Sequence, residues 1–156
     1  MSKSFNSEGI VLKRINYSDA DRIVTIYTKK FGKVVAMAKG VRKTSSRKKG
    51  GLEPGTLSLC HFVRGRGMLL VTQTSIINSF SNSQSDLVSI TQTFQILEII
   101  DALTVEEEPN DVVYQTLMES LTIMETNGSK KTRLLENIKT IMIAVKLHNR
   151  IREMMV

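Results

Sequence analysis

Five short runs in which apolar and polar residues alternate fill the first half of this 156-residue chain. Alternation with a period of two sends successive side chains to opposite faces of a sheet, so it predicts β-strands. Glycine, proline, asparagine and serine cluster between the runs, as is typical of turns. The predicted strands are residues 8–15, 20–28, 33–38, 56–63 and 68–76. A fold built only from helices is therefore excluded for this half.

Tight turns connect several of these strands. Gly32 stands where a short hairpin needs positive φ, and Pro54-Gly55 forms a turn before the fourth strand. Arg64-Gly65-Arg66-Gly67 joins the fourth strand to the fifth. We therefore expect five antiparallel strands that close into a small barrel. The oligonucleotide-binding fold (OB-fold) is the leading candidate, because it uses five strands and offers one strand face and its loops to single-stranded nucleic acid.

The hydrophobic period changes beyond residue 80. Apolar residues there recur at every third or fourth position, which predicts helices that bury one face. The first helix begins at a Ser85-Asp86 cap and reaches Leu103, and the other two span residues 112–125 and 132–154. Together they predict a three-helix bundle that packs on itself and on the barrel.

Two polar segments separate the helices. Glu106-Glu107-Glu108-Pro109 predicts a solvated loop and the first turn of the next helix rather than a metal site, because anions suit a helix N-terminus. Asn127-Gly128-Ser129 predicts a helix stop. The chain is thus predicted to be an α+β protein, with an OB-fold nucleic-acid-binding domain over residues 1–80 and a helical domain over residues 81–156.

Basic residues are concentrated in the first 80 positions. This half has fifteen Lys/Arg against four Asp/Glu, a net +11, whereas the second half has seven against eleven, a net −4. Residues 39–51, the basic loop, contain six Lys/Arg and three glycines and no acid. Cations at this density repel one another unless an anion neutralises them, so the loop is predicted to bind phosphates. A disordered solubilising loop is the alternative, and the flanking strands favour the binding loop.

Cations from the strands and loops form the candidate nucleic-acid site, with backbone phosphates as their ligands. Tyr17, Phe31 and Phe62 are candidates for stacking on bases, although for each of them taken singly a core position is favoured over a stacking platform. The chain has eight aromatic residues and no tryptophan, so we expect charge to contribute more than stacking and sequence specificity to be low. The predicted phosphate-binding residues are Lys13, Arg14, Arg22, Lys39, Arg42, Lys43, Arg47, Lys48, Lys49, Arg64 and Arg66.

The sequence gives no indication of catalysis. Cys60 is the single cysteine and is expected to be a buried small hydrophobe, and His61 and His148 have no metal-ligating neighbours at suitable spacing. Asp19 and Asp21 precede Arg22 and predict a local ion pair rather than a metal site. We predict a protein that is not an enzyme and that uses no cofactor or metal. The absence of a signal segment or a long apolar run predicts a cytoplasmic protein.

An ordered series of short motifs runs through the first 80 residues. It comprises Glu-Gly-Ile-Val-Leu-Lys-Arg (8–14), Asp-Arg-Ile-Val-Thr (21–25), Ala-Lys-Gly-Val-Arg-Lys (38–43), Leu-Glu-Pro-Gly (52–55) and Gly-Arg-Gly (65–67). This series resembles the N-terminal half of RecO, the bacterial recombination mediator and DNA-annealing protein. The resemblance covers residues 8–80, and residues 81–125 match only as a helical pattern.

The resemblance implies an OB-fold barrel followed by a helical domain. It also implies binding to single-stranded and double-stranded DNA, strand annealing, and partnership with RecR and the single-stranded DNA-binding protein to load RecA. The expected location is the bacterial cytoplasm, in association with the nucleoid. Strand annealing and the partnership with RecR, the single-stranded DNA-binding protein and RecA are implied by the resemblance alone.

The chain departs from the RecO pattern in its second half. Many members carry a four-cysteine zinc element there, whereas this chain has no cysteine after Cys60 and is shorter than a typical member. We expect either a truncated chain or a reduced natural variant. The competing functional hypothesis is an interaction scaffold, in which the helical bundle recruits a protein and the basic barrel binds RNA or an acidic partner.

Overall fold

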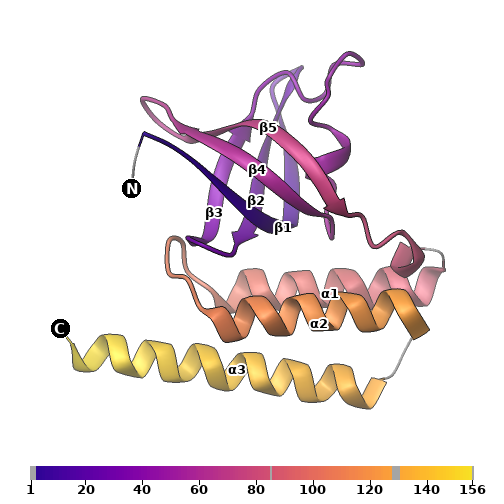
Figure 1. Ribbon diagram of the computed structural model, residues 1–156, viewed down its shortest axis with the longest axis vertical. Helices are drawn as coiled ribbons and strands as arrows, with labels where there is room; N and C mark the ends of the chain where they lie inside the picture. Colours follow the sequence, from indigo (N-terminus) through magenta and orange to yellow (C-terminus); the bar gives the residue numbers. More distant parts are fainter. Residues whose placement is uncertain (1–2, 85, 128–130, 156) are drawn as a thin grey trace.

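The computed structural model describes residues 3–84, 86–127 and 131–155, and it begins with a closed five-stranded barrel (Figure 1). The strands hydrogen-bond in the order β1-β2-β3-β5-β4, and β4 returns to β1. The predicted five strands, the OB-like barrel and the α+β class are confirmed. The bounds are β1 (Ser4–Tyr17), β2 (Asp21–Thr28), β3 (Gly32–Ala38), β4 (Leu57–Arg64) and β5 (Leu69–Asn78).

The barrel is mixed rather than wholly antiparallel. β3 and β5 run parallel where Ala36 pairs with Leu69 and Met37 with Leu70. The expectation of five antiparallel strands was wrong at this seam. Residues 39–56 carry the chain away from β3, so β4 pairs with β1 and β5 then lies beside β3 in the same direction. Alternation specifies which face of a strand is buried, not which partner the strand takes.

β1 begins earlier than predicted and serves two neighbours. Its first part, Ser4 to Ile10, pairs with β4, and its second part, Gly9 to Tyr17, pairs with β2. The register with β2 shifts between Val11 and Lys13, which is a bulge. A bulge increases local twist, so it lets one strand turn from one partner to the other and close the barrel.

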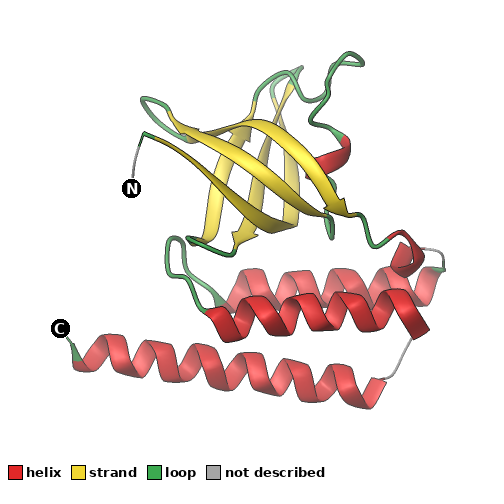
Figure 2. Cartoon of the chain, viewed as in Figure 1, coloured by secondary structure: helices red, strands yellow, loops and turns green. Residues whose placement is uncertain are grey.

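Three helices follow the barrel, as predicted (Figure 2). They are α1 (Leu87–Leu103), α2 (Asp111–Asn127) and α3 (Lys131–Met154). Asp86 caps α1, because its carboxylate accepts a hydrogen bond from the backbone N–H of Ser89 at 2.9 Å. Ser85, Gly128 and Ser129, to which sequence patterns also assigned helix ends, lie outside the described residues. Short 3₁₀ turns occur at Gly50–Leu52 and Ser81–Gln84.

Two apolar clusters hold the molecule together. One fills the barrel and includes Val24, Ala36 and Phe62. The other joins barrel residues to helix residues. α1 and α2 lie against one end of the barrel, and α3 packs on their far side (Figure 1). None of the helices in the described ranges is both long and apolar enough to cross a membrane. The basic loop lies at the end of the barrel opposite the helices.

Candidate nucleic-acid interface

The outward face of the barrel carries four apolar side chains in register across four strands. Ile15 pairs with Ile23, Ile23 with Met37, and Met37 with Leu70. Val24, Ala36 and Val71, which neighbour Ile23, Met37 and Leu70 along their strands, are buried in the barrel core, so these three point outward, and Ile15 lies on the same face through its pairing with Ile23. Ile15 is 55% exposed and the other three are half-buried. We call these four residues the aliphatic row. In OB-folds this face, around the second and third strands, receives single-stranded ligands.

The basic loop is fastened to the turn between β1 and β2, beside one end of the aliphatic row. The backbone N–H of Arg42 donates to the carbonyl of Ala20 at 2.9 Å, and its guanidinium donates to the carbonyl of Ser18 at 2.6 Å. The backbone N–H of Gly40 donates to the carboxylate of Asp21 at 2.8 Å. These bonds fix where the loop leaves the barrel.

Asp21 therefore has a different partner from the one predicted. Its carboxylate accepts from the Gly40 amide and from the Ser18 hydroxyl, whereas an ion pair with Arg22 was expected. The Gly40 hydrogen bond lowers the pKa of Asp21, partial burial opposes this effect, and Ser18, Lys39 and Lys43 add to it. Asp21 is thus an anchor for the basic loop and remains ionised.

Two of the six cations in the basic loop have structural partners. Arg42 binds Ser18 as described above, and the Lys48 ammonium donates to the carbonyl of Lys39 at 2.8 Å. Burial lowers the pKa of Lys48, and the nearby Asp21 opposes this shift. The other four are exposed, and within the described part of the chain their side chains form no hydrogen bond or ion pair. These loop cations are Lys39, Lys43, Arg47 and Lys49.

Three further predicted cations lie on the barrel and already face acids. Lys13 is 3.0 Å from the Asp101 carboxylate, and Arg14 is 3.1 Å from the Glu53 carboxylate. Arg22 also faces Glu53, at 3.7 Å, and donates to the side-chain oxygen of Asn16 at 3.0 Å. Arg22 is only 9% exposed, and burial lowers its pKa. Each of these three cations is therefore engaged with an acid in this structure, and their assignment to phosphate contacts stays a prediction.

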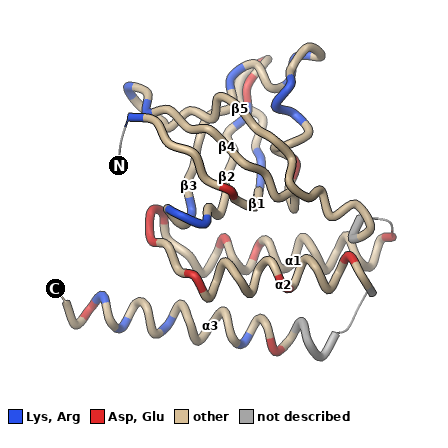
Figure 3. Tube along the Cα trace, viewed as in Figure 1, with Lys and Arg blue, Asp and Glu red and all other residues tan. Residues whose placement is uncertain are grey.

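The hairpin between β4 and β5 supplies the remaining two predicted cations. Arg64 is 3.0 Å from the Glu107 carboxylate, and Arg66 is exposed on the turn. Figure 3 shows Lys and Arg on this hairpin and on the loop after β3, both on the part of the barrel that points away from the helices. Basic segments therefore stand at more than one place around the rim of the barrel.

The three candidate stacking aromatics differ in exposure. Phe62 is fully buried and stacks on Phe5 at a ring distance of 5.0 Å, so it is a core residue and not a stacking platform. Phe31 is half-buried and packs edge-on against Phe5 at 4.4 Å. Tyr17 is 51% exposed at the end of β1, beside the basic loop. Of the three, only Tyr17 offers an open ring.

The aliphatic row was missed in the sequence, although a signal was present. β2 and β3 contain apolar residues at successive positions, such as Ile23-Val24 and Ala36-Met37. A strand that is apolar on both faces must cover something on each face. Here one face fills the barrel and the other faces outward and is partly exposed.

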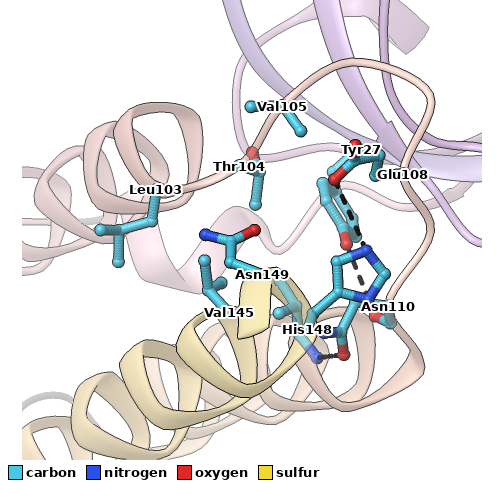
Figure 4. Close-up of a pocket in the computed structure, with 10 residues that line it drawn as sticks. Tyr27, Leu103, Thr104, Val105, Glu108, Asn110, Val145, His148 and Asn149 are labelled. Atoms are coloured by element: carbon cyan, nitrogen blue, oxygen red, sulfur yellow. Dashed lines mark hydrogen bonds and ion pairs between the residues drawn. The ribbon is translucent and has the colours of Figure 1, made fainter. Parts of the chain in front are cut away.

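The junction between barrel and helices contains a small, partly open pocket (Figure 4). Its volume is about 20 Å³, which is room for roughly one water molecule. Tyr27 donates to the carbonyl of Asn110 at 3.5 Å across it, and burial raises the Tyr27 pKa to about 12. His148 is 3.5 Å from the Glu108 carboxylate. The described residues include no group of three His, Cys, Asp or Glu side chains placed to hold a metal.

Comparison with known proteins identifies the family. The sequence matches the model described as "Recombination protein O N terminal" over residues 1–80, just over half of the chain. The chain belongs to the RecO family. The matched residues contain the whole barrel, including the aliphatic row and the basic loop, so both features lie in the part of the chain that defines RecO membership.

Individual RecO proteins match over more of the chain. The DNA repair protein RecO of Pelotomaculum thermopropionicum is 33% identical over 122 residues, which is 78% of this chain and 48% of that protein. The RecO of Syntrophus aciditrophicus is 35% identical over 131 residues, 83% of this chain and 50% of that protein. The RecO of Listeria welshimeri is 32% identical over 114 residues, 73% of this chain and 45% of that protein. The chain thus spans about half the length of the curated relatives it matches.

Proposed function

We propose that this chain binds single-stranded and double-stranded DNA through the outward face of its barrel and promotes the annealing of complementary strands. The observation that carries the proposal is the position of the basic loop beside the aliphatic row. Four exposed cations lack a partner in the described structure, and the start of their loop is fastened beside the apolar strand face on which bases can pack, while its later part reaches Thr74 on β5. Phosphate contacts then supply affinity, and the row supplies contact area without a sequence preference.

The aliphatic row suits annealing better than tight storage of a single strand. Aromatic platforms stabilise bound bases by about 1–3 kcal/mol each. Ile23 and Met37 offer dispersion contact but no ring on which a base can stack. Bases held in this way keep their pairing edges free and exchange readily with a second strand. Binding needs no catalytic group, so the proposed activity is not enzymatic.

The family supports a place for this chain in recombination. We propose that it acts with RecR and the single-stranded DNA-binding protein to help load RecA, as its resemblance to RecO implies. The alternative is an interaction scaffold that recruits a protein or binds RNA. Its support is the exposed apolar residues of α3, such as Leu147 at 54% and Ile151 at 57% exposure.

A salt-dependent DNA titration tests the proposal. Four cations that each neutralise one phosphate give a slope of log K against log salt of about −3 for a single strand. The variant Lys43→Ala/Arg47→Ala/Lys49→Ala should reduce this slope in magnitude by about 2. The matched control is Lys139→Ala/Lys146→Ala/Arg150→Ala, which removes three exposed charges from α3.

The measurement is fluorescence anisotropy of a labelled oligonucleotide between 50 and 300 mM salt, with an RNA of the same sequence as competitor. A slope near zero for the unmodified protein would contradict DNA binding through the basic loop. Equal effects of the loop variant and the α3 control would show that only net charge matters. Stronger binding of the RNA would favour the scaffold alternative.

A further inference from the structure

The segment between α1 and α2, residues 104–110, is the most acidic part of the chain and is built onto the barrel. The backbone N–H of Glu107 donates to the carbonyl of Lys33 at 2.9 Å, and Glu106 forms a parallel bridge with Lys33. Gly32 permits this close approach, since a Cβ there would lie 2.7 Å from the backbone of Glu108. We call residues 104–110 the acidic loop.

The Lys33 side chain fixes where the acidic loop starts. Its ammonium donates to the carbonyls of Asp101 at 2.8 Å and Thr104 at 2.7 Å, and lies 3.2 Å from the Asp101 carboxylate. The Lys33 side chain is only 12% exposed. A cation that binds carbonyls at a helix C-terminus satisfies groups that have no partner within the helix. The loop therefore leaves α1 along a defined path across the edge of β3.

This path delivers the Glu107 carboxylate to the β4–β5 hairpin. The carboxylate lies 3.0 Å from the Arg64 guanidinium, and both side chains are about half exposed, at 53% and 46%. Glu107 itself has a φ of 60°, a left-handed conformation that glutamate rarely adopts. An open cleft of about 280 Å³ lies between loop and hairpin, lined in part by Arg64, Gly67, Met68 and Glu106.

We propose that Glu107 occupies the position of a phosphate on Arg64 and that nucleic acid must displace it to bind there. A guanidinium recognises carboxylate and phosphate with the same donors, so the two ligands compete for one place. The acidic loop is therefore an internal competitor at the hairpin end of the binding face. The inference rests on the proposed function, because it names a regulator of the same site.

The variant Glu107→Gln tests the inference, since it keeps the length of the side chain and removes its charge. It should bind single-stranded DNA about two- to five-fold more tightly at 50 mM salt, the range expected for loss of a half-exposed ion pair. Its salt slope should become more negative by about 0.7, because Arg64 then neutralises one more phosphate. Glu107→Asn is the second variant, because asparagine accepts positive φ readily.

Two comparisons make the test specific. Glu98→Gln removes one exposed charge from α1 and should leave affinity near that of the unmodified protein, which controls for net charge. In an Arg64→Gln background, Glu107→Gln should give no gain beyond that of Glu98→Gln. A thermal melt of each variant establishes that it is folded.

The outcomes separate this inference from the proposed function. The unmodified protein could bind DNA in a salt-dependent way while Glu107→Gln and Glu98→Gln bind with equal affinity. That result would overturn the inference that Glu107 competes with nucleic acid, and it would leave the proposed DNA binding intact. A gain that persists in the Arg64→Gln background also overturns it, because the effect then does not pass through Arg64. Absence of salt-dependent binding in every variant overturns both proposals.

Discussion

Asp21 connects the basic loop to the barrel through a single carboxylate. Its pKa lies below the ordinary value of 3.8, chiefly because the Gly40 amide donates to the ionised form. A carboxyl whose pKa falls on folding stabilises the folded state above its ordinary pKa, and that contribution is lost as pH falls through the lower, folded-state value. The anchor therefore holds throughout the neutral range and is released only in acid, below about pH 4.

Replacing Asp21 with alanine should loosen the basic loop. The Gly40 amide and the Ser18 hydroxyl lose their acceptor, while the strands on both sides remain paired. We expect faster trypsin cleavage after the lysines and arginines of residues 39–49, measured by mass spectrometry over time. Asp19→Ala removes a neighbouring exposed acid and is the control. Equal cleavage rates for the two variants would show that Asp21 does not hold the loop.

Cys60 should be unreactive in the folded protein. It is fully buried, and burial raises the pKa of its thiol to about 12, so almost no thiolate forms near neutral pH. A thiol reagent at pH 8 should label Cys60 only as the protein unfolds in denaturant. The extent of labelling and the extent of unfolding should therefore rise over the same range of denaturant concentration. Stoichiometric labelling in the absence of denaturant would contradict the burial of Cys60.

At the level of elements, two glycines with the same backbone conformation should respond differently to a side chain. Gly32 and Gly40 both have φ of 68°. A Cβ at Gly32 meets the backbone of Glu108 at 2.7 Å, whereas one at Gly40 meets only the flexible side chain of Lys43 at 3.8 Å. Left-handed conformation alone destabilises alanine by roughly 1–2 kcal/mol.

Gly40→Ala should therefore lower the free energy of unfolding by about 1 kcal/mol, and Gly32→Ala by clearly more, because the acidic loop must also move. Urea denaturation followed by circular dichroism measures both values. Similar losses of unfolding free energy for the two variants would show that the acidic loop can move away from a side chain at residue 32 at little energetic cost.

The sequence predicted where the strands and helices lie better than it predicted which strands pair with each other. Alternation and turn residues located five strands and three helices, but nothing in that pattern required β3 to pair with β5, since pairing depends on how the chain closes in space. The partners of the cations were also hidden in the sequence. Lys13, Arg14 and Arg22 were assigned to phosphate contacts because a cluster of cations does not show which acid each one faces in the fold. In the structure each faces an acid that is distant in sequence, Asp101 or Glu53.

For the whole molecule, annealing requires that two repelling strands be neutralised together while their base edges stay free. The exposed loop cations can contact both backbones from the rim of the barrel. Lys43→Ala/Arg47→Ala/Lys49→Ala should slow annealing of complementary oligonucleotides severalfold and change stability by only a few tenths of a kcal/mol. Fluorescence quenching reports annealing, and a thermal melt reports stability.

The α3 variant Lys139→Ala/Lys146→Ala/Arg150→Ala is the control for charge in this assay as well. It should anneal at nearly the rate of the unmodified protein. Unchanged annealing by the loop variant would mean that the basic loop is only a solubilising tether. The hairpin residues Arg64 and Arg66 would then be the remaining candidates on the rim.

The apolar cluster shared by barrel and helices limits how this protein can change over evolution. The cluster joins Ile10, Tyr27 and Leu57 of the barrel to Leu97 and Leu117 of the helices. Separating the two parts would therefore expose apolar side chains on both of them to water. A descendant that lost its helices would keep the proposed nucleic-acid face, but it would expose the apolar barrel residues that the helices now cover and would be prone to aggregate. The proposed nucleic-acid face therefore depends on helix packing, even though no helix residue forms part of that face.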